Sequence, residues 1–427
     1  MTAIRAPHLP EAAIRARARR GTAAIFPDLD EYGLTLFGAE HATALAGDEL
    51  DEARLVPPVF MPRRLEKLIE LGREPAYGDV DLTSAIGGFR ARLPVFLCAF
   101  GSTQVAQSGL GVAASEQAGR LGIPMVIGEN VMPVHGYGRG GDGPPDGLLG
   151  RILAYARAAP AGLGGVVVQQ STEDADAEVW NMVYSDPSAT ALLETGRLAF
   201  ELKVGQGAKP GLGGMTVLPR SAAAKVAGQY AVDEVFGPAS PVVLRSASPG
   251  TFTSEILRQQ VHLMRNNFPR ARTWVKLHPG RDVRLAAEVA WNAGADAVTV
   301  DGAEGGTGWA PSVFLRGVGL PLAECLRRIG KHDGDLLVSG RVWEGSRALK
   351  CLAMGTTAVG LGRAALLAVN EDLADGLVRL VQCLELELRL LISALGKYRL
   401  ADLDEADLWS PRDVSTGPDR RAPEATR

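Results

Sequence analysis

Short apolar runs alternate with amphipathic stretches over most of the chain. Eight of these runs predict β-strands, at residues 94–99, 124–128, 165–169, 199–204, 273–277, 297–300, 335–339 and 357–360. Helical spacing fits between most of them, for example at 112–121, 148–159, 283–293 and 342–354. Short apolar strands alternating with helices predict parallel βαβ units. Eight units favour a closed (β/α)8 TIM barrel over an open doubly wound sheet, so the fold class is α/β.

The pattern changes at both ends of the predicted barrel. We expect residues 1–92 to form an N-terminal cap with a helix at 63–71, and residues 93–370 to form the barrel. Residues 371–410 are a C-terminal helical segment, in which 371–396 predict one long amphipathic helix. Its leucines indicate core or subunit contacts. The polar, proline-rich tail at 411–427 predicts disorder.

Composition excludes several classes of protein. The 427 residues are 46% hydrophobic and 22% charged, with a net charge of −4, which is typical of a soluble globular protein and not of a nucleic-acid binder. No apolar run has the length of a membrane span, and no secretory signal begins the chain. The four cysteines form no CxxC pair. We therefore expect neither a metal site nor disulfides, and a cytoplasmic location.

Glycines and arginines follow the last two predicted strands. Ligands of such barrels bind at the carboxyl ends of the strands, and phosphates commonly bind after the seventh and eighth. Gly340 and Arg341 follow the seventh strand, and Gly360, Gly362 and Arg363 follow the eighth. Backbone N–H groups and the two arginines would bind a phosphate there. The alternative is that the glycines form ordinary turns and the arginines lie on the surface.

Charged side chains in or just after other strands are candidates for chemistry. Lys276 lies mid-strand, where a charge is costly unless it is paired. It is either one half of a buried salt bridge or a cation that stabilises a reduced flavin ring, and Lys203 raises the same question. Asp301 and Glu304 are acid/base groups or hold the glycine-rich loop by hydrogen bonds. Glu129 is a base or a structural acceptor.

Two motifs carry a resemblance to a known family. The segments ELKVGQGAKPGLGG (201–214) and VDGAEGGTGWAP (300–311) resemble the FMN-binding synthase domain of the glutamate synthase family. GVGLPLAECL (317–326) fits the segment that follows, and the resemblance extends over roughly residues 76–408. It implies an FMN-binding (β/α)8 barrel.

The resemblance also implies a set of site residues. Lys209 would hold a substrate carboxylate, and Lys276 would stabilise the reduced flavin. The residues expected to contact the flavin, its phosphate or the adjoining substrate are Ala99, Ser102, Gln169, Lys203, Lys276, Gly305, Gly306, Thr307, Gly340, Arg341, Gly360, Gly362 and Arg363.

The departures from the family pattern concern electron supply and substrate. The family's true glutamate synthases bind an iron–sulfur cluster through closely spaced cysteines after strand eight, where residues 362–376 contain none. A cluster needs three or four thiolates, so none is expected. The family's glutamine after the double glycine is replaced by Met215. We expect no glutaminase domain, because Cys98 is the first cysteine and lies in a strand.

The sequence thus predicts an FMN-dependent oxidoreductase with an altered substrate. Hydride would pass between flavin and a small amine, imine, 2-oxo acid or hydroxy acid, with catalytic candidates Lys276, Lys209, Glu129 and Asp301. One alternative is a synthase-type subunit that needs partner chains for ammonia and electrons. Another is a non-redox flavin isomerase, like type 2 isopentenyl diphosphate isomerase. The leucine-rich late helix also makes a homo-oligomer plausible.

Overall fold

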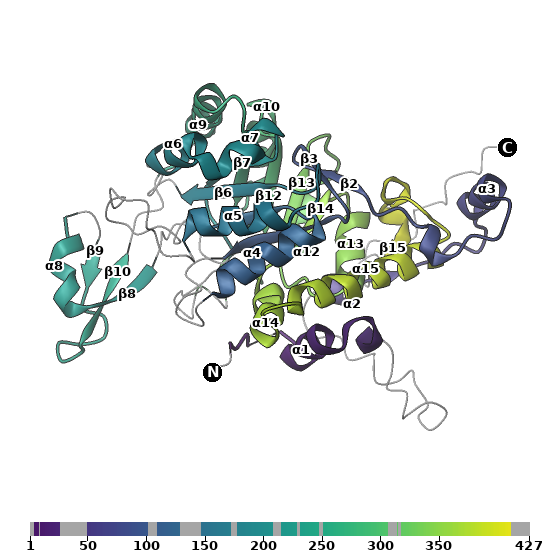
Figure 1. Cartoon of the computed structure of the whole chain (residues 1–427), viewed down its shortest axis with the longest axis horizontal. Helices are drawn as coiled ribbons and strands as arrows, with labels where there is room; N and C mark the ends of the chain where they lie inside the picture. The colour runs from purple at the N-terminus through teal and green to yellow at the C-terminus, as the bar shows by residue number, and fades with distance from the viewer. Residues whose placement is uncertain are drawn as a thin grey trace.

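Figure 1 shows a computed structural model in which a barrel of strands is surrounded by helices, with a small separate sheet to one side. The structure describes residues 4–7, 9–25, 49–100, 109–128, 147–171, 177–207, 215–228, 231–246, 251–305, 314 and 317–410. The predicted disordered tail at 411–427 lies outside these residues.

Eight parallel strands close into a barrel, which confirms the predicted (β/α)8 fold. All eight predicted strands are present, with ends that shift by one or two residues. In barrel order the strands are β11 (Arg272–Leu277), β12 (Ala297–Asp301), β13 (Leu336–Ser339), β14 (Ala358–Leu361), β4 (Val95–Phe100), β5 (Met125–Ile127), β6 (Val166–Ser171) and β7 (Leu198–Lys203). Because β7 pairs again with β11, the ring has no open edge.

The strands are apolar on both faces because each face packs against a different core. Alternate residues point into the barrel, where Val167, Ala199 and Trp274 belong to an interior cluster of buried side chains. Their neighbours Val168 and Phe200 point outward and pack under the helices. This double burial explains why the sequence shows continuous apolar runs instead of an alternating pattern.

A hairpin closes the amino-terminal end of the barrel. Strands β2 (Ser84–Ile86) and β3 (Phe89–Ala91) are joined by Gly87 and Gly88, which both have positive φ. Trp274 donates from Nε1 to the Gly87 carbonyl over 3.0 Å. A Cβ on Gly87 would lie 2.4 Å from the indole ring, so only glycine fits. With this end filled, the carboxyl end is left for a ligand.

Helices cover the outside of the barrel. One of them, α9 (Ser254–Asn267), precedes β11. The others follow barrel strands and are α4 (Leu110–Leu121), α5 (Leu148–Ala158), α6 (Ala177–Ser185), α7 (Thr190–Glu194), α10 (Val283–Asn292), α12 (Leu322–Ile329), α13 (Gly345–Ala353) and α14 (Arg363–Glu371). Among the described helices, none combines the length and apolar character that crossing a membrane requires.

The N-terminal region packs beside the end of the chain. Helix α1 (Glu11–Arg20) contacts α14 and α15 (Gly376–Ala394), and strand β1 (Arg54–Leu55) pairs with β15 (Leu408–Trp409). The short helix α2 (Glu49–Glu52) lies against α12 and α13, and α3 (Pro62–Leu71) projects from the body (Figure 1). The division into cap, barrel and C-terminal segment remains a prediction.

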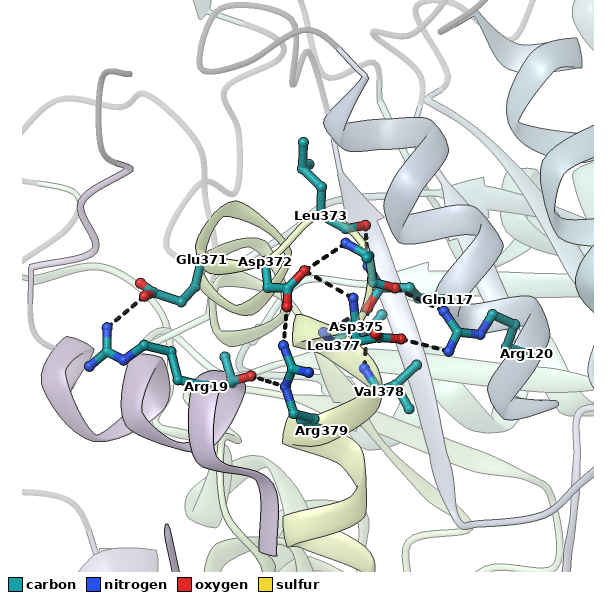
Figure 2. Close-up of polar contacts among 12 residues, drawn as sticks. Arg19, Gln117, Arg120, Glu371, Asp372, Leu373, Asp375, Leu377, Val378 and Arg379 are labelled. Atoms are coloured by element: carbon teal, nitrogen blue, oxygen red, sulfur yellow. Dashed lines mark hydrogen bonds and ion pairs between the residues drawn. The ribbon is translucent and has the colours of Figure 1, made fainter. Parts of the chain in front are cut away.

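The prediction of a single helix over 371–396 was wrong. Helix α14 ends at Glu371, and α15 begins five residues later. Between them Asp372 accepts hydrogen bonds from the backbone N–H groups of Ala374 and Asp375, at 2.8 and 3.2 Å (Figure 2). These bonds hold the chain in a turn that competes with the helix.

Helix α4 supplies the cap of α15. Gln117 accepts hydrogen bonds from the N–H groups of Leu377 and Val378, at 2.8 and 3.2 Å, and donates to the Leu373 carbonyl at 2.9 Å (Figure 2). The free N–H groups at the start of α15 are thereby satisfied by a side chain 260 residues away. The buried leucines of α15 belong to the core.

The long connection between β7 and β11 contains a sheet that the periodicity did not predict. Strands β8 (Met215–Pro219), β10 (Val242–Ser246) and β9 (Ala231–Asp233) form an antiparallel sheet in that order, with α8 (Ala223–Val226) beside it. In Figure 1 it lies apart from the barrel.

Candidate active site

A buried ion pair lies inside the carboxyl end of the barrel. Lys276 Nζ is 3.0 Å from Oδ2 of Asp301, and their side chains are 8% and 1% exposed. The other carboxylate oxygen of Asp301 accepts a hydrogen bond from the Ser339 hydroxyl. Burial lowers the pKa of Lys276, but the nearby carboxylates of Asp301 and Glu201 outweigh it and raise the pKa above its ordinary value. Lys276 is therefore a fixed positive charge.

A second buried carboxyl lies beside this pair. Glu201 accepts hydrogen bonds from the Gln169 amide and, over 2.8 Å, from the Thr299 hydroxyl. Burial raises the pKa of Glu201, and the Lys276 charge and these two hydrogen bonds offset only part of that effect. The carboxylate takes one amide proton of Gln169, so the amide oxygen of Gln169 remains available as an acceptor.

Cys98 lies next to the ion pair but is not a nucleophile. Burial raises the pKa of its thiol to about 12, so the reactive thiolate is not populated near neutral pH. The thiol instead fills space, since a Cβ on Gly360 would lie 2.4 Å from its sulfur. Glycine at position 360 therefore permits close packing of β14 on β4.

A pocket opens at the carboxyl ends of β13 and β14. Its cavity volume is about 20 Å³, it is continuous with open solvent, and it is lined by Leu9, Gly305, Ser339, Gly340, Arg341, Val342, Gly360, Gly362, Arg363 and Ala364. Helix α14 begins here, so its first N–H groups, which have no partner within the helix, face this region. A Cβ on Gly362 would meet nothing closer than 3.8 Å, so the glycine leaves open space. This donor-rich, glycine-lined geometry suits an anion.

Two carboxylates and one backbone carbonyl hold the arginines at and beside this pocket. Arg341 donates to Asp51 over 3.0 Å, and Arg347 donates to Asp51 and to Glu304 over 2.8 Å each. Arg363 donates to the Glu304 backbone carbonyl. Both Arg341 and Arg363 are partly buried pocket residues, so the alternative of two surface arginines does not hold.

Glu304 stabilises the start of the glycine-rich loop. Besides pairing with Arg347, its carboxylate accepts the N–H of Leu322 at 3.1 and 3.2 Å. Of the two roles that the sequence left open for Glu304, the contacts support the structural one. Among the described residues the Asp301 carboxylate contacts Lys276 and Ser339, and both roles that the sequence left open for Asp301 remain predictions.

Two further polar residues lie at the ends of β7 and β11. Lys203 donates to the Gln206 side chain over 3.1 Å. His278 packs so closely against Gly205 that a Cβ there would lie 2.6 Å from Nδ1. Among the described residues, the buried Nδ1 of His278 has no hydrogen-bond partner. Burial lowers the pKa of this imidazole, which favours the neutral form.

Most of the predicted site residues that the structure describes lie on this end of the barrel. Ala99 lies near the end of β4, half-buried beside the interior cluster. The ion pair and the pocket account for seven predicted residues beyond Lys276, namely Asp301, Gly305, Gly340, Arg341, Gly360, Gly362 and Arg363. Ser102, Glu129, Lys209, Gly306 and Thr307 lie outside the described residues.

Sequence reasoning missed several residues of these networks. Glu201 stands mid-strand between apolar residues, so the argument applied to Lys276 would have found it. Ser339 and Thr299 give no such signal, because hydroxyls are common in strands. Asp51 and Arg347 lie 296 positions apart, and only the fold brings them together.

Comparisons with known proteins agree with this geometry. Residues 188–375 match the family described as the conserved region in glutamate synthase. The archaeal-type glutamate synthase [NADPH] of Dehalococcoides mccartyi is 31% identical over 192 residues, which cover 43% of this chain and 37% of that protein. The chain thus aligns with less than half the length of this curated relative.

Solved structures share the fold at low sequence identity. An oxidised active mutant of (S)-mandelate dehydrogenase superposes with a TM-score of 0.57 at 16% identity, covering 94% of this chain and 99% of that one. A mandelate oxidase variant with a monooxide FMN adduct gives 0.54 at 18% identity, covering 92% and 98%. Residues 188–375 thus match the conserved region in glutamate synthase, on a barrel whose fold is shared with these enzymes.

Proposed function

We propose that this chain is an FMN-dependent oxidoreductase. It would transfer a hydride between the flavin and a small amine, imine, 2-oxo acid or 2-hydroxy acid. The observation that carries the proposal is the pocket between the ends of β13 and β14, which offers Arg363 and the start of α14 to a phosphate. The family match and the FMN named for the mandelate oxidase structure support the same cofactor.

The residues of the pocket fit a flavin phosphate. Gly340, Gly360 and Gly362 leave the backbone accessible, and Arg341 and Arg363 bring positive charge. A phosphate would accept hydrogen bonds from the N–H groups at the start of α14, where the helix dipole also favours an anion. When bound, FMN supplies a two-electron acceptor and donor for the substrate.

Lys276 is the proposed electrostatic group of the site. Its positive charge is fixed by Asp301, and both are buried, so the charge acts through a low dielectric. Such a preorganised cation stabilises negative charge that develops on a bound ring during reduction. In this proposal Asp301 positions the ammonium group, and Gln169 presents its amide oxygen to the polar edge of the ring.

Other roles remain proposals from the resemblance. Ala99, Ser102, Lys203, Gly305, Gly306 and Thr307 would border the flavin or the adjoining substrate, and Lys209 would bind the substrate carboxylate. Glu129 is the candidate acid/base group. We further propose a reducing, cytoplasmic setting, which is supported by four buried cysteines that form no disulfide. A partner chain would supply any further electron-transfer component, and self-association of the chain is a separate proposal.

Anaerobic reduction tests the proposal. Protein loaded with FMN is mixed with a panel of amino acids, simple amines and 2-hydroxy acids, and the loss of flavin absorbance is followed. We expect one class to bleach the flavin, and Lys276→Met to slow bleaching by about tenfold to a hundredfold. The control is Lys331→Met, which removes an exposed lysine on the connection before β13. No bleaching by any class, or equal rates in Lys276→Met, would refute the proposal.

A further inference from the structure

The N-terminal segment places a carboxylate among the arginines of the pocket. Asp51 lies on α2, outside the region that matches the family. One oxygen accepts from Arg347 Nη1 over 2.8 Å and the other accepts from Arg341 Nη2 over 3.0 Å. The side chains of Asp51 and Arg341 are only 16% and 15% exposed, and that of Arg347 is 2% exposed. Asp51 therefore bridges two largely desolvated guanidinium groups.

The surrounding contacts fix α2 in this position. The Lys350 ammonium donates to the Leu50 carbonyl over 2.7 Å. Glu49 pairs with Arg327 and accepts a hydrogen bond from the Ser410 hydroxyl. Because the helices α12 and α13 each contribute a cation to this anchoring, the position of Asp51 is set by the barrel and not by α2 alone.

Three guanidinium groups meet at this place. Besides Arg341 and Arg347 there is Arg363, whose pKa is lowered first by burial and then by the Arg341 charge. Against these three cations stand the carboxylates of Asp51 and Glu304. Like charges this close repel unless anions hold them. These five described groups together carry one positive charge, which favours a further anion in the pocket.

We propose that Asp51 is a positioning residue for phosphate recognition, which holds the Arg341 guanidinium toward the pocket. Arg341 has a φ of 57° and is the only described non-glycine residue with positive φ. Its backbone is therefore in the left-handed region, which non-glycine residues adopt rarely. The Asp51 carboxylate fixes the other end of the same side chain. The inference rests on the proposed function, because the phosphate that it concerns is that of FMN.

Two effects of Asp51 on a phosphate have opposite signs. Its negative charge repels the phosphate, so removing the charge would tighten binding if charge alone mattered. Its hydrogen bonds orient Arg341 and keep Arg341 and Arg347 together, so removing them would weaken binding. We expect the orientation of Arg341 to outweigh the charge repulsion. The sign of the change in phosphate affinity when Asp51 is replaced decides between these two effects.

Binding of two flavins to Asp51→Asn separates a phosphate effect from general damage. FMN carries the phosphate and riboflavin does not, while the rings are the same. We expect Asp51→Asn to weaken FMN binding by about tenfold or more and to change riboflavin binding by less than about twofold. The matched control is Glu52→Gln, an exposed carboxyl one residue further along α2, which should change neither affinity. Fluorescence titration of the apoprotein gives both dissociation constants.

The outcomes distinguish the two proposals. A wild type that does not prefer FMN over riboflavin refutes the proposed function, whatever the variant does. If the wild type prefers FMN, two results refute this inference alone. One is that Asp51→Asn keeps or increases the preference for FMN, and the other is that Asp51→Asn weakens the binding of FMN and of riboflavin equally.

A double variant tests the route through Arg341. If Asp51 acts by positioning Arg341, FMN affinity should be the same in Arg341→Ala and in Arg341→Ala combined with Asp51→Asn. Additive losses would show that Asp51 acts on the phosphate site independently of Arg341, against the inference.

Discussion

The polar interior of the barrel contains Lys276, Asp301 and Glu201, whose buried charges are neutralised to different degrees. Lys276 and Asp301 neutralise each other at 3.0 Å. Glu201 accepts hydrogen bonds from Gln169 and Thr299, and no other described residue forms an ion pair with it. A buried carboxyl of this kind costs free energy when it ionises, and its raised pKa expresses that cost.

Glu201→Gln should therefore alter how stability depends on pH. Above its ordinary pKa of 4.5 Glu201 ionises in the unfolded chain, whereas burial keeps it protonated in the folded protein up to a higher pH. The unfolded state then binds fewer protons, so the contribution of Glu201 to the free energy of unfolding falls as pH rises above 4.5. We expect the wild type to lose stability relative to Glu201→Gln over this range. Urea unfolding at several pH values measures it, and a constant difference would contradict the assignment.

Lys276→Met should destabilise the fold by about 3 to 5 kcal/mol, because it leaves the Asp301 charge buried without its cation. Combining it with Asp301→Asn should recover much of the loss, since both charges are then absent. Guanidinium unfolding compares the single and double variants. If the single variant is as stable as the wild type, the buried pair does not exist as described.

At the level of elements, glycine decides where helices can meet. The carbonyl oxygen of Ala368, near the end of α14, lies 1.8 Å from the position that a Cβ on Gly376 would occupy. The backbone at the start of α15 thus packs directly on α14. Gln117 and Asp372 then complete the hydrogen bonds of the turn between them (Figure 2).

Gly376→Ala should force these two helices apart and lower the free energy of unfolding by about 1 to 3 kcal/mol. The control is Gly78→Ala, because a Cβ on Gly78 would meet nothing within 4 Å. The melting temperatures of the two variants check this. Equal melting temperatures would show that α14 and α15 are not in close backbone contact.

The elements also show what sequence alone predicts. Strands buried on both faces leave continuous apolar runs, so all eight barrel strands were predictable. The break at Asp372 was not, because the amphipathic pattern runs on through it and the competing bonds come partly from Gln117 on another helix. The β8–β10–β9 sheet was not predicted, because strands β9 and β10 are partly exposed and end in polar residues, so they leave no long apolar run.

The candidate site also contains residues that the sequence predicts and residues that it does not. Lys276 and the glycines after β13 and β14 were identifiable, because a mid-strand charge and glycines at a barrel mouth are local signals. The partners that set their chemistry were not, because contacts such as Asp51 with Arg347 span 296 residues. Local sequence predicts which groups are present, and the fold determines which groups they meet.

For the whole molecule, the two ends of the barrel differ in a way that fits one ligand site. The amino-terminal end is filled by the β2–β3 hairpin and Trp274. The carboxyl end carries the buried ion pair and the glycine-lined pocket, with the N-terminal segment contributing Leu9 to its wall. This asymmetry directs both the phosphate and the reacting ring of the proposed cofactor to the same end.

The absorption spectrum of the purified protein tests the central claim most directly, recorded before and after heat release of any bound ligand. We expect flavin bands, with the released flavin identified by chromatography as FMN at one molecule per chain. Reconstitution of the apoprotein with FMN should restore the bands. A colourless protein that binds no added FMN would contradict the account, because the pocket after β13 and β14 would then hold no flavin phosphate.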